Sequence, residues 1–259
     1  MKKENILAID TKYIGHPYIH VEETGSTNDD AKRMAAEGAP HGTVICADYQ
    51  TGGKGRRGRT WDSPKGDNIY LSILLRPEIE PEYASMLTLV GALAAAEAVE
   101  EAAGADCKIK WPNDLVLEGK KVCGILTEMT YTEAGEYSVV IGIGINVNRD
   151  IFPDEIAHMA SSIQKGKGKE GIIAALLNHF ERKYEAFVKE KSLAPFLDEY
   201  HNRLVSRNTP VQIISGEETV LRRCMGIDST GAMIVQDEKG QEERIISGEV
   251  SVRGLYGYV

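Results

Sequence analysis

The chain has 259 residues, of which 42% are hydrophobic and 27% charged, and its formal net charge is -9. A chain of this length can bury a large core, so the fold requires neither a metal nor a disulfide to hold it together. The acidic balance argues against general nucleic-acid binding, which usually shows as a surplus of basic residues.

Helical and strand patterns alternate over the first 206 residues. Residues 26–40 predict a helix, because Ser26 or Thr27 can cap its start and a Gly-x-Pro sequence ends it. Strands rich in β-branched residues should follow, together with one hairpin. We place the strands at residues 42–50, 67–77, 107–111 and 137–147, and the hairpin at residues 114–131.

Three further helices are expected. Residues 83–104 are apolar nearly all round, which favours a helix packed in the interior. After a polar connection at 162–171, residues 172–190 have apolar spacings of three and four, typical of an amphipathic helix, and 192–204 resemble another.

The pattern changes near residue 205. Only short strands and turns follow, with strands expected at residues 209–214, 219–228, 231–237 and 242–248. About fifty residues of this kind predict a small antiparallel barrel. We therefore expect a large α+β domain over residues 1–206 and a small β domain over residues 207–259.

Cysteine usage and hydropathy indicate the compartment. The cysteines (Cys46, Cys107, Cys123 and Cys224) are scattered and form no C-x-x-C pair, as expected of free thiols in a reducing compartment. The N-terminal apolar stretch is too short for a signal peptide, and no segment approaches the ~20 apolar residues of a membrane span. We expect a cytoplasmic protein that contacts no membrane.

The segment "GGKGRRGRTW", residues 52–61, concentrates four cations among glycines in an otherwise acidic chain. Glycine N–H groups can cradle an anion, arginines add bidentate contacts, and Trp61 offers a ring face. The spacing is not that of a P-loop. The alternatives are a solvated loop or a weak nucleic-acid arm. Because like charges repel, we expect a mobile loop that an anion orders into a lid.

Two more segments stand out. Lys110 ends a strand in "KWPNDL" among apolar residues, a costly position unless it meets an anion, although it could be a snorkelling surface lysine. In "IGIGINVN", Gly142, Gly144 and Asn146 share one face of a strand, and isoleucines share the other. The empty face indicates close approach to the backbone, tight packing against the alanine-rich helix, or both.

Smaller signals come from "STN" and from Gln50. The serine, threonine and asparagine at 26–28 favour a helix cap that can also contact a ligand. Gln50 ends a strand beside the basic loop. The six histidines show no metal-ligand spacing, and neither a G-x-S-x-G elbow nor a G-x-G-x-x-G dinucleotide motif is present. We therefore assign no metal-ligating residues.

Together these segments resemble a biotin–protein ligase. The matching motifs occur in order: "STN", Q-x-x-G-K-G-R-R-G-R-x-W, "KWPNDL", K-V-C-G-I-L-x-E and G-I-G-I-N-V-N. The resemblance implies a class II synthetase-like biotin/lipoate ligase catalytic domain, with a mixed β-sheet and flanking helices, followed by a C-terminal SH3-like barrel. It also implies a biotin–[acetyl-CoA-carboxylase] ligase that uses ATP, biotin and Mg²⁺.

The implied reaction has two steps. The biotin carboxylate attacks the α-phosphorus of ATP to give biotinyl-5′-AMP and pyrophosphate, and a lysine of a biotin carboxyl carrier protein then takes the acyl group. No nucleophilic side chain of the enzyme is needed, since cations and positioning carry the chemistry. The C-terminal domain would support carrier docking or close over the nucleotide.

The resemblance also assigns roles to residues. Lys110 and Arg56 would be catalytic. Biotin contacts are implied for Ser26, Thr27, Asn28, Gln50, Lys54, Gly55, Arg56 and Lys110. Nucleotide contacts are implied for Arg57, Arg59, Trp61 and Asn146. The family commonly has arginine where this chain has Lys54, which keeps the charge but loses the planar fork.

Further expectations concern partners of the protein and alternative functions. Only about seventeen residues precede the match, too few for the DNA-binding domain of some bacterial members, so the resemblance implies a ligase without repressor activity. It leaves a homodimer possible. A lipoate ligase or octanoyltransferase would share the chemistry but lacks this basic loop and "KWPNDL", and a non-enzymatic nucleic-acid binder is opposed by the acidic charge.

Overall fold

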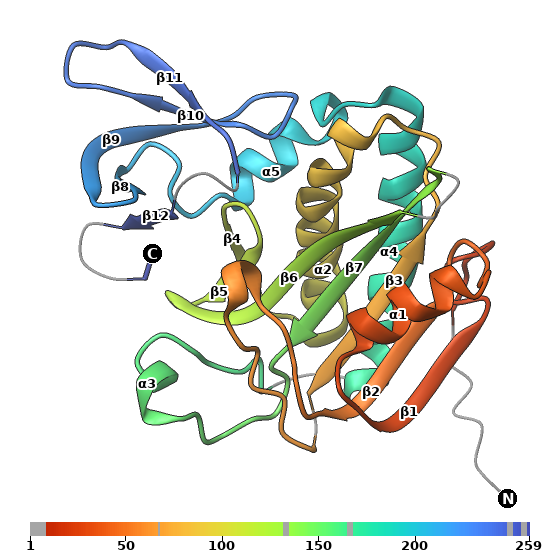
Figure 1. Cartoon of the computed structure of the whole chain (residues 1–259). Helices are drawn as coiled ribbons and strands as arrows, with labels where there is room; N and C mark the ends of the chain where they lie inside the picture. Colours follow the sequence, from red (N-terminus) through yellow and green to blue (C-terminus); the bar gives the residue numbers. More distant parts are fainter. Residues whose placement is uncertain (1–8, 67, 132–134, 165–167, 248–250, 255–257) are drawn as a thin grey trace, which may run out of the picture.

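A seven-stranded mixed sheet forms the centre of the larger part of the chain (Figure 1). The computed structural model describes residues 9–66, 68–131, 135–164, 168–247, 251–254 and 258–259. Only the pair β1–β2 is parallel, and every other neighbouring pair is antiparallel. In spatial order the strands are β1 (Tyr18–Thr24), β2 (Val44–Gln50), β3 (Ile69–Leu75), β7 (Tyr137–Ile145), β6 (Lys120–Tyr131), β5 (Asp114–Leu117) and β4 (Lys108–Lys110).

Helices cover both faces of this sheet. The helices α2 (Leu87–Ala103) and α4 (Gly168–Glu190) pack together on one face, and α1 (Thr27–Ala36) lies on the other (Figure 1). The odd-numbered isoleucines of β7 belong to the core beneath α2. The predicted α+β class with a mixed sheet and flanking helices is confirmed.

The larger part also contains short 3₁₀ helices and a further α-helix. They are η1 (Arg56–Gly58), η2 (Pro81–Met86), η3 (Ala194–Phe196) and α5 (Leu197–Arg203).

The C-terminal part forms a separate five-stranded antiparallel sheet. The second sheet has the order β11 (Glu242–Ile245), β10 (Met233–Gln236), β9 (Glu218–Ile227), β8 (Pro210–Ser215) and β12 (Ser251–Gly254). Its apolar side joins the main core. The division at residues 206 and 207 stays a prediction.

Sequence patterns missed three elements. They are the edge strand β1, the short helix α3 (Asp154–Ala157) and β12. The predicted polar connection at 162–171 lies partly outside the described residues, and α4 already begins at Gly168. The cysteines are all buried and free. Within the described ranges, no helix has the length and apolar character needed to cross a bilayer.

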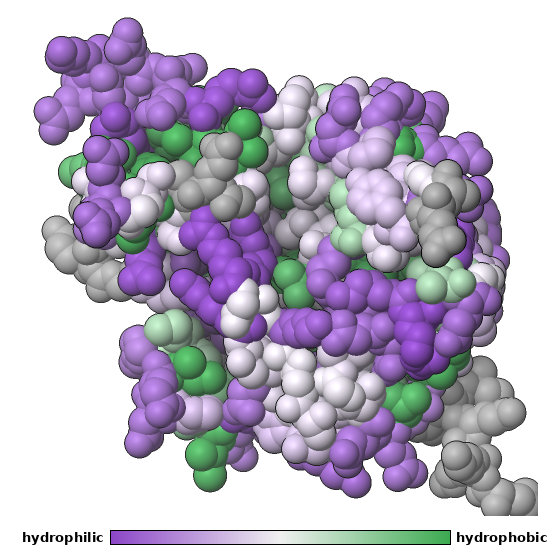
Figure 2. Space-filling model, viewed as in Figure 1, coloured by the Kyte–Doolittle hydropathy of each residue, from purple (hydrophilic) through white to green (hydrophobic). Residues whose placement is uncertain are grey.

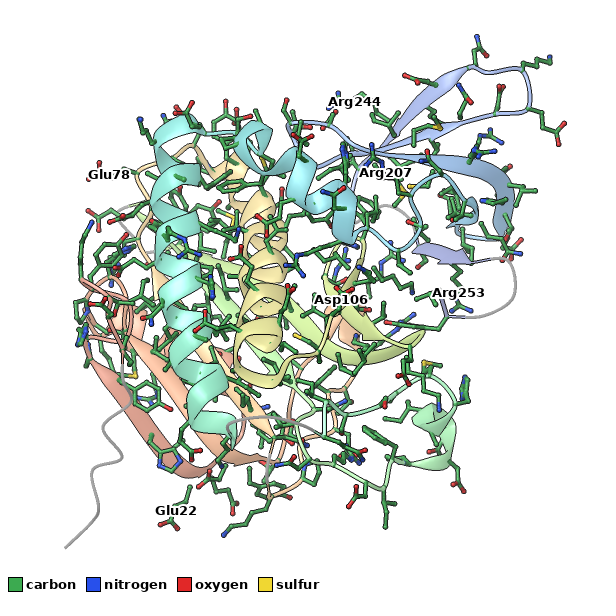
Figure 3. The ribbon with its side chains drawn as sticks, turned by 180° about the vertical axis from the view of Figure 1, so that it is seen from behind. Glu22, Glu78, Asp106, Arg207, Arg244 and Arg253 are labelled. Atoms are coloured by element: carbon green, nitrogen blue, oxygen red, sulfur yellow. The ribbon has the colours of Figure 1, made fainter. Side chains whose placement is uncertain are left out.

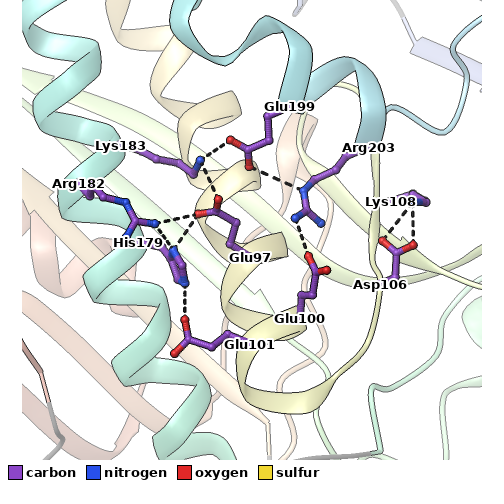
Figure 4. Close-up of polar contacts among 10 residues, drawn as sticks. All are labelled: Glu97, Glu100, Glu101, Asp106, Lys108, His179, Arg182, Lys183, Glu199 and Arg203. Carbon is purple, nitrogen blue, oxygen red and sulfur yellow. Dashed lines mark hydrogen bonds and ion pairs between the residues drawn. The ribbon is translucent and has the colours of Figure 1, made fainter.

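A buried ion-pair network ties α2, α4 and α5 together (Figure 4). The Lys183 side chain is only 7% exposed, and its Nζ lies 3.2 Å from Glu97 Oε1 and 2.5 Å from Glu199 Oε2. Glu97 also lies 2.8 Å from His179 Nδ1. Two carboxylates from different helices therefore share one buried ammonium.

We predict that Lys183→Met lowers the free energy of unfolding by about 2–4 kcal/mol, because it leaves Glu97 and Glu199 without their shared cation. Urea unfolding at neutral pH measures the effect. The control is Lys189→Met on the same helix, where the side chain is 82% exposed and the change should stay below about 0.5 kcal/mol. Equal losses in both variants would contradict the role of the network.

Candidate active site

Two side chains from other elements, Asn28 and Trp61, pack against the glycine face of β7. A Cβ at Gly142 would meet the Asn28 side-chain amide, and one at Gly144 would lie 2.5 Å from Trp61 Nε1. Gly124 on β6 has the same relation to the Trp61 ring, at 2.8 Å from Cζ3. The interpretation as close approach is thus confirmed, and the alternative of packing against the alanine-rich helix is wrong, because α2 lies on the isoleucine face.

The N-terminus of α1 is held by tertiary contacts. Ser26 occupies the N-cap position, but its side chain makes no capping hydrogen bond, so the predicted side-chain cap is wrong. Instead, Thr27 N and Oγ1 both donate to Gln50 Oε1, at 2.9 and 3.1 Å. Gln50 Nε2 donates to Ser63 Oγ at 3.0 Å. The first residue of α1 is therefore tied to the end of β2.

Asn28 is fixed from two sides. Its Oδ1 lies 2.6 Å from Ser72 Oγ, and its Nδ2 donates to Glu128 Oε2 at 2.7 Å. Glu128 is neutralised by Lys32, whose Nζ lies 2.9 Å away. The side chains at 26–28 are each only 3% exposed. They therefore form a rigid polar wall.

This wall and the basic loop enclose a small first cavity of about 60 Å³. The loop contributes Lys54, Gly55, Arg56 and Trp61, and the glycines of β6 and β7 form the floor. The Trp61 Nε1 donor is buried and has no hydrogen-bond partner among the described residues. Several site residues predicted from the sequence line this first cavity: Ser26, Thr27, Asn28, Gln50, Lys54, Gly55, Arg56 and Trp61.

A second, larger cavity of about 880 Å³ adjoins the first. The two share Gly55, Arg56 and Trp61 of the loop, together with Asn113 and Lys121. Figure 2 shows hydrophilic residues gathered on this face between the C-terminal sheet and the larger one. Cations dominate the lining of the second cavity: Arg56, Arg57, Arg59, Lys110, Lys121 and Arg253. The arrangement can attract a highly charged anion.

The basic loop is tied to its surroundings by its charged side chains. Lys54 Nζ lies 2.6 Å from Asp29 Oδ1. Arg56 donates from Nη1 to Asn113 Oδ1 at 2.9 Å and from Nη2 to Ser247 Oγ at 3.1 Å, and its burial lowers the pKa of the guanidinium. Arg57 donates to Ser251 Oγ at 2.9 Å. The loop thus connects both sheets, while its expected mobility stays a prediction.

Lys110 differs from Lys54 and Lys121, two other lysines of the site, because each of those has a carboxylate partner. In the part of the chain that the structure describes, every ion pair of the site uses another lysine, and no carboxylate lies within 4 Å of Lys110 Nζ. Burial lowers the pKa of Lys110 to about 8, Asp114 opposes the shift, and Lys121, Arg253 and Arg59 add to it. Figure 3 labels Arg253 where the C-terminal sheet faces the larger sheet. An anionic ligand would relieve this desolvated charge.

Asn146 is not brought to either cavity. Its Nδ2 donates to Ser161 O at 3.1 Å and its backbone N–H to Val122 O at 2.8 Å. The residue joins the end of β7 to the segment after α3.

Sequence reasoning missed several residues that line the site. Lys121 is the first residue of the K-V-C-G-I-L-x-E motif, but nothing in the local sequence indicated that its side chain lines the site. Its Nζ lies 2.6 Å from Asp114 Oδ1 and 5.2 Å from the Trp61 ring centroid. Arg253 and Tyr258 carry no local signal, since only the path of the C-terminal segment brings them here.

The Lys110 environment gives a stability prediction. Because the folded-state pKa is about 8 against an ordinary 10.5, the folded chain binds fewer protons than the unfolded chain between these pH values. Carrying the charge therefore costs stability below pH 8, and the cost fades as pH rises toward 10.5. We expect Lys110→Met to raise the free energy of unfolding at pH 7 by about 1–3 kcal/mol.

Urea unfolding at pH 7 and pH 10 measures this difference, which should shrink at the higher pH. Lys108→Met is the matched control, because Lys108 lies on the same strand with its side chain 43% exposed beside Asp106. A Lys110→Met variant less stable than the parent at pH 7 would show that the buried ammonium is stabilised by its surroundings.

Comparison with known proteins gives a consistent result. Residues 21–146 match the model of the Biotin/lipoate A/B protein ligase family, and residues 208–253 match the Biotin protein ligase C terminal domain. The chain is 36% identical over 250 residues to the bifunctional ligase/repressor BirA of Bacillus spizizenii, covering 93% of this chain and 76% of that protein.

Two further proteins are similar over most of their length. The biotin–[acetyl-CoA-carboxylase] ligase of Paracoccus denitrificans is 31% identical over 228 residues, covering 85% of this chain and 94% of the relative. The structure of the biotin protein ligase from Aquifex aeolicus in complex with biotin and ATP superimposes with a TM-score of 0.79 at 30% identity, covering 92% of this chain and 98% of that one. The chain therefore belongs to the biotin protein ligase family.

Proposed function

We propose that this ligase activates biotin with ATP to give biotinyl-5′-AMP and pyrophosphate, and then transfers biotin to a lysine of a biotin carboxyl carrier protein. The observation that carries the proposal is the pair of adjoining cavities that share the basic loop. One has a buried polar wall, and the other is lined by cations that include Lys110, a half-buried lysine with no carboxylate within 4 Å among the described residues. Such a pair suits an uncharged ring system with a carboxylate tail next to a polyphosphate.

The first cavity is assigned to biotin. Asn28, Thr27 and Gln50 supply amide and hydroxyl groups, and Trp61 Nε1 supplies a free donor. The volume of about 60 Å³ is well below the ~300 Å³ typical of small-molecule sites. Biotin therefore enters only if the loop from Lys54 to Trp61 shifts outward. Closure behind the ligand would exclude water from the reactive adenylate.

The second cavity is assigned to the nucleotide, with Arg57 and Arg59 on the phosphates and Trp61 near the adenine. Lys110 and Arg56 would neutralise the carboxylate and the α-phosphate as the new bond forms, which is electrostatic catalysis by preorganised cations. Lys110 would then contact both ligands from the wall of the nucleotide cavity. A nucleotide role for Asn146 stays a prediction, because its side chain faces Ser161.

Magnesium belongs with the nucleotide in this proposal. Mg²⁺ at nucleotide sites is usually held by phosphates and one or two carboxylates, and it would neutralise phosphate charge. The described residues contain no group of three acidic, histidine or cysteine side chains suited to a metal. Asp114 is the carboxylate on the lining of the second cavity. This fits a metal that arrives with ATP.

The remaining assignments concern partners. The acceptor lysine must lose its proton before attack, and it would reach the acyl group through the second cavity, whose volume is about 880 Å³. The BirA relatives are named as both ligases and repressors, so the absence of repressor activity and of nucleic-acid binding stays a prediction supported by the acidic charge. A homodimer and the cytoplasmic location likewise stay predictions.

The decisive test is exchange of labelled pyrophosphate into ATP, with biotin, lipoate and octanoate offered separately. We expect exchange with biotin alone, reduced at least about 100-fold in Lys110→Ala because transition-state charge is lost. Lys108→Ala is the control. Exchange with lipoate or octanoate would reassign the first cavity, and no exchange by folded protein with Mg²⁺ would contradict adenylation.

The floor of the first cavity gives a second test. Gly142→Ala places a Cβ against the Asn28 amide, so we expect Asn28 to be displaced and the KM for biotin to rise about tenfold or more, with the KM for ATP changed little. Gly91→Ala on α2 is the control, because its Cβ would make ordinary 3.7 Å contacts with Ile125 and Ile141. An unchanged KM for biotin would remove Asn28 from the biotin site.

A further inference from the structure

Tyr258, near the end of the sequence, reaches into the second cavity. Tyr258 is part of its lining, and Lys110 Nζ lies 3.6 Å from the centroid of the Tyr258 ring. The Tyr258 hydroxyl donates a hydrogen bond to Asp114 Oδ2. Burial, with Asp114 adding to it, raises the pKa of this hydroxyl well above its usual range, so it stays a donor at neutral pH. One side chain thus contacts both charged residues of the K-W-P-N-D segment.

This ring is the contact that Lys110 has in place of an ion pair. Asp114 is already engaged by Lys121 Nζ at 2.6 Å and by Asn113 Nδ2 at 3.1 Å, and it acts on Lys110 only at longer range. An aromatic face attracts an ammonium, and more strongly where water is excluded. A lysine stem has several rotatable bonds, so a fixed ring also restricts where the ammonium can lie.

Close packing of the C-terminal residues against two glycines places the Tyr258 ring beside Lys110. Gly254 ends β12, and a Cβ there would collide with the backbone of Val259. Val259 Cγ2 in turn lies 3.5 Å from the position of a Cβ at Gly119, in the turn between β5 and β6. The absence of a side chain at Gly254 therefore lets the end of the sequence fold back beside β12 toward Lys110.

We propose that Tyr258 is a positioning residue of the ligase: its ring holds the Lys110 ammonium, and its hydroxyl bond to Asp114 fixes the ring, so that Lys110 faces the anions in the second cavity. Tyr258 acts through Lys110 rather than on the reacting atoms. The proposal rests on the adenylation reaction proposed above.

The kinetic test compares Tyr258→Leu and Tyr258→Phe in biotin-dependent pyrophosphate exchange. We expect Tyr258→Leu to lower kcat about tenfold with the KM for biotin within about twofold, and Tyr258→Phe to keep most of the activity because the ring remains. Tyr131→Leu, at the far end of β6 with 60% exposure, is the matched control and should behave as the parent chain. Melting temperatures identify any variant that fails to fold.

A second measurement needs no ligand. Lysine acetylation by N-hydroxysuccinimidyl acetate, followed residue by residue with mass spectrometry, compares Lys110 with the exposed Lys120 in the same chain. We expect Tyr258→Leu to raise the relative rate at Lys110 several-fold. Gly254→Ala should do the same, because it displaces the terminal residues while leaving the tyrosine itself in place.

The outcomes separate the two proposals. A parent chain that shows no exchange contradicts the adenylation reaction. A parent chain that exchanges, with Tyr258→Leu unchanged in kcat and in Lys110 acetylation, contradicts the positioning role alone. A faster Tyr258→Leu with a lower KM for ATP would also overturn it, since the ring would then obstruct the nucleotide.

Discussion

A half-buried ammonium without a carboxylate partner among the described residues is the constraint around which the site is arranged. Lys54 and Lys121 on either side each have an acidic partner, Asp29 and Asp114 respectively. Lys110 has an aromatic ring instead, and its pKa falls to about 8. A cation held this way attracts an incoming anion more strongly than one already paired, because no existing ion pair has to be broken. Although the chain as a whole is acidic, the lining of the second cavity carries more cations than carboxylates.

The two sheets build this site jointly. Trp111 Nε1 donates to Gly231 O at 3.0 Å, and the apolar side chains of both sheets form one continuous core. Arg56 and Arg57 of the basic loop reach serines of the C-terminal segment. Any movement of the loop would therefore have to break or shift hydrogen bonds to both parts of the chain.

Local sequence patterns predicted what depends on local physics. The all-apolar α2, the hairpin of β5 and β6 and the two unlike faces of β7 follow from periodicity and turn residues. The edge strand β1 was missed because "YIHVEET" is largely polar and its parallel pairing with β2 is non-local. The Ser26 side-chain cap was predicted and is absent, whereas the contact of Thr27 with Gln50 is tertiary and leaves no local pattern. Tyr258 could not be found, since its place depends on the whole path of the C-terminal segment.

The two faces of β7 have different tasks, since one packs into the core and the other lines the first cavity. The isoleucine face carries the packing that stabilises the sheet, whereas the opposite face contributes no side chains of its own between Gly142 and Gly144. The side chains that cover that face come from elsewhere, Asn28 from α1 and Trp61 from the loop. The chemistry of the pocket can accordingly be re-engineered by changing residues on α1 or the loop, with the hydrophobic interior of the sheet left intact.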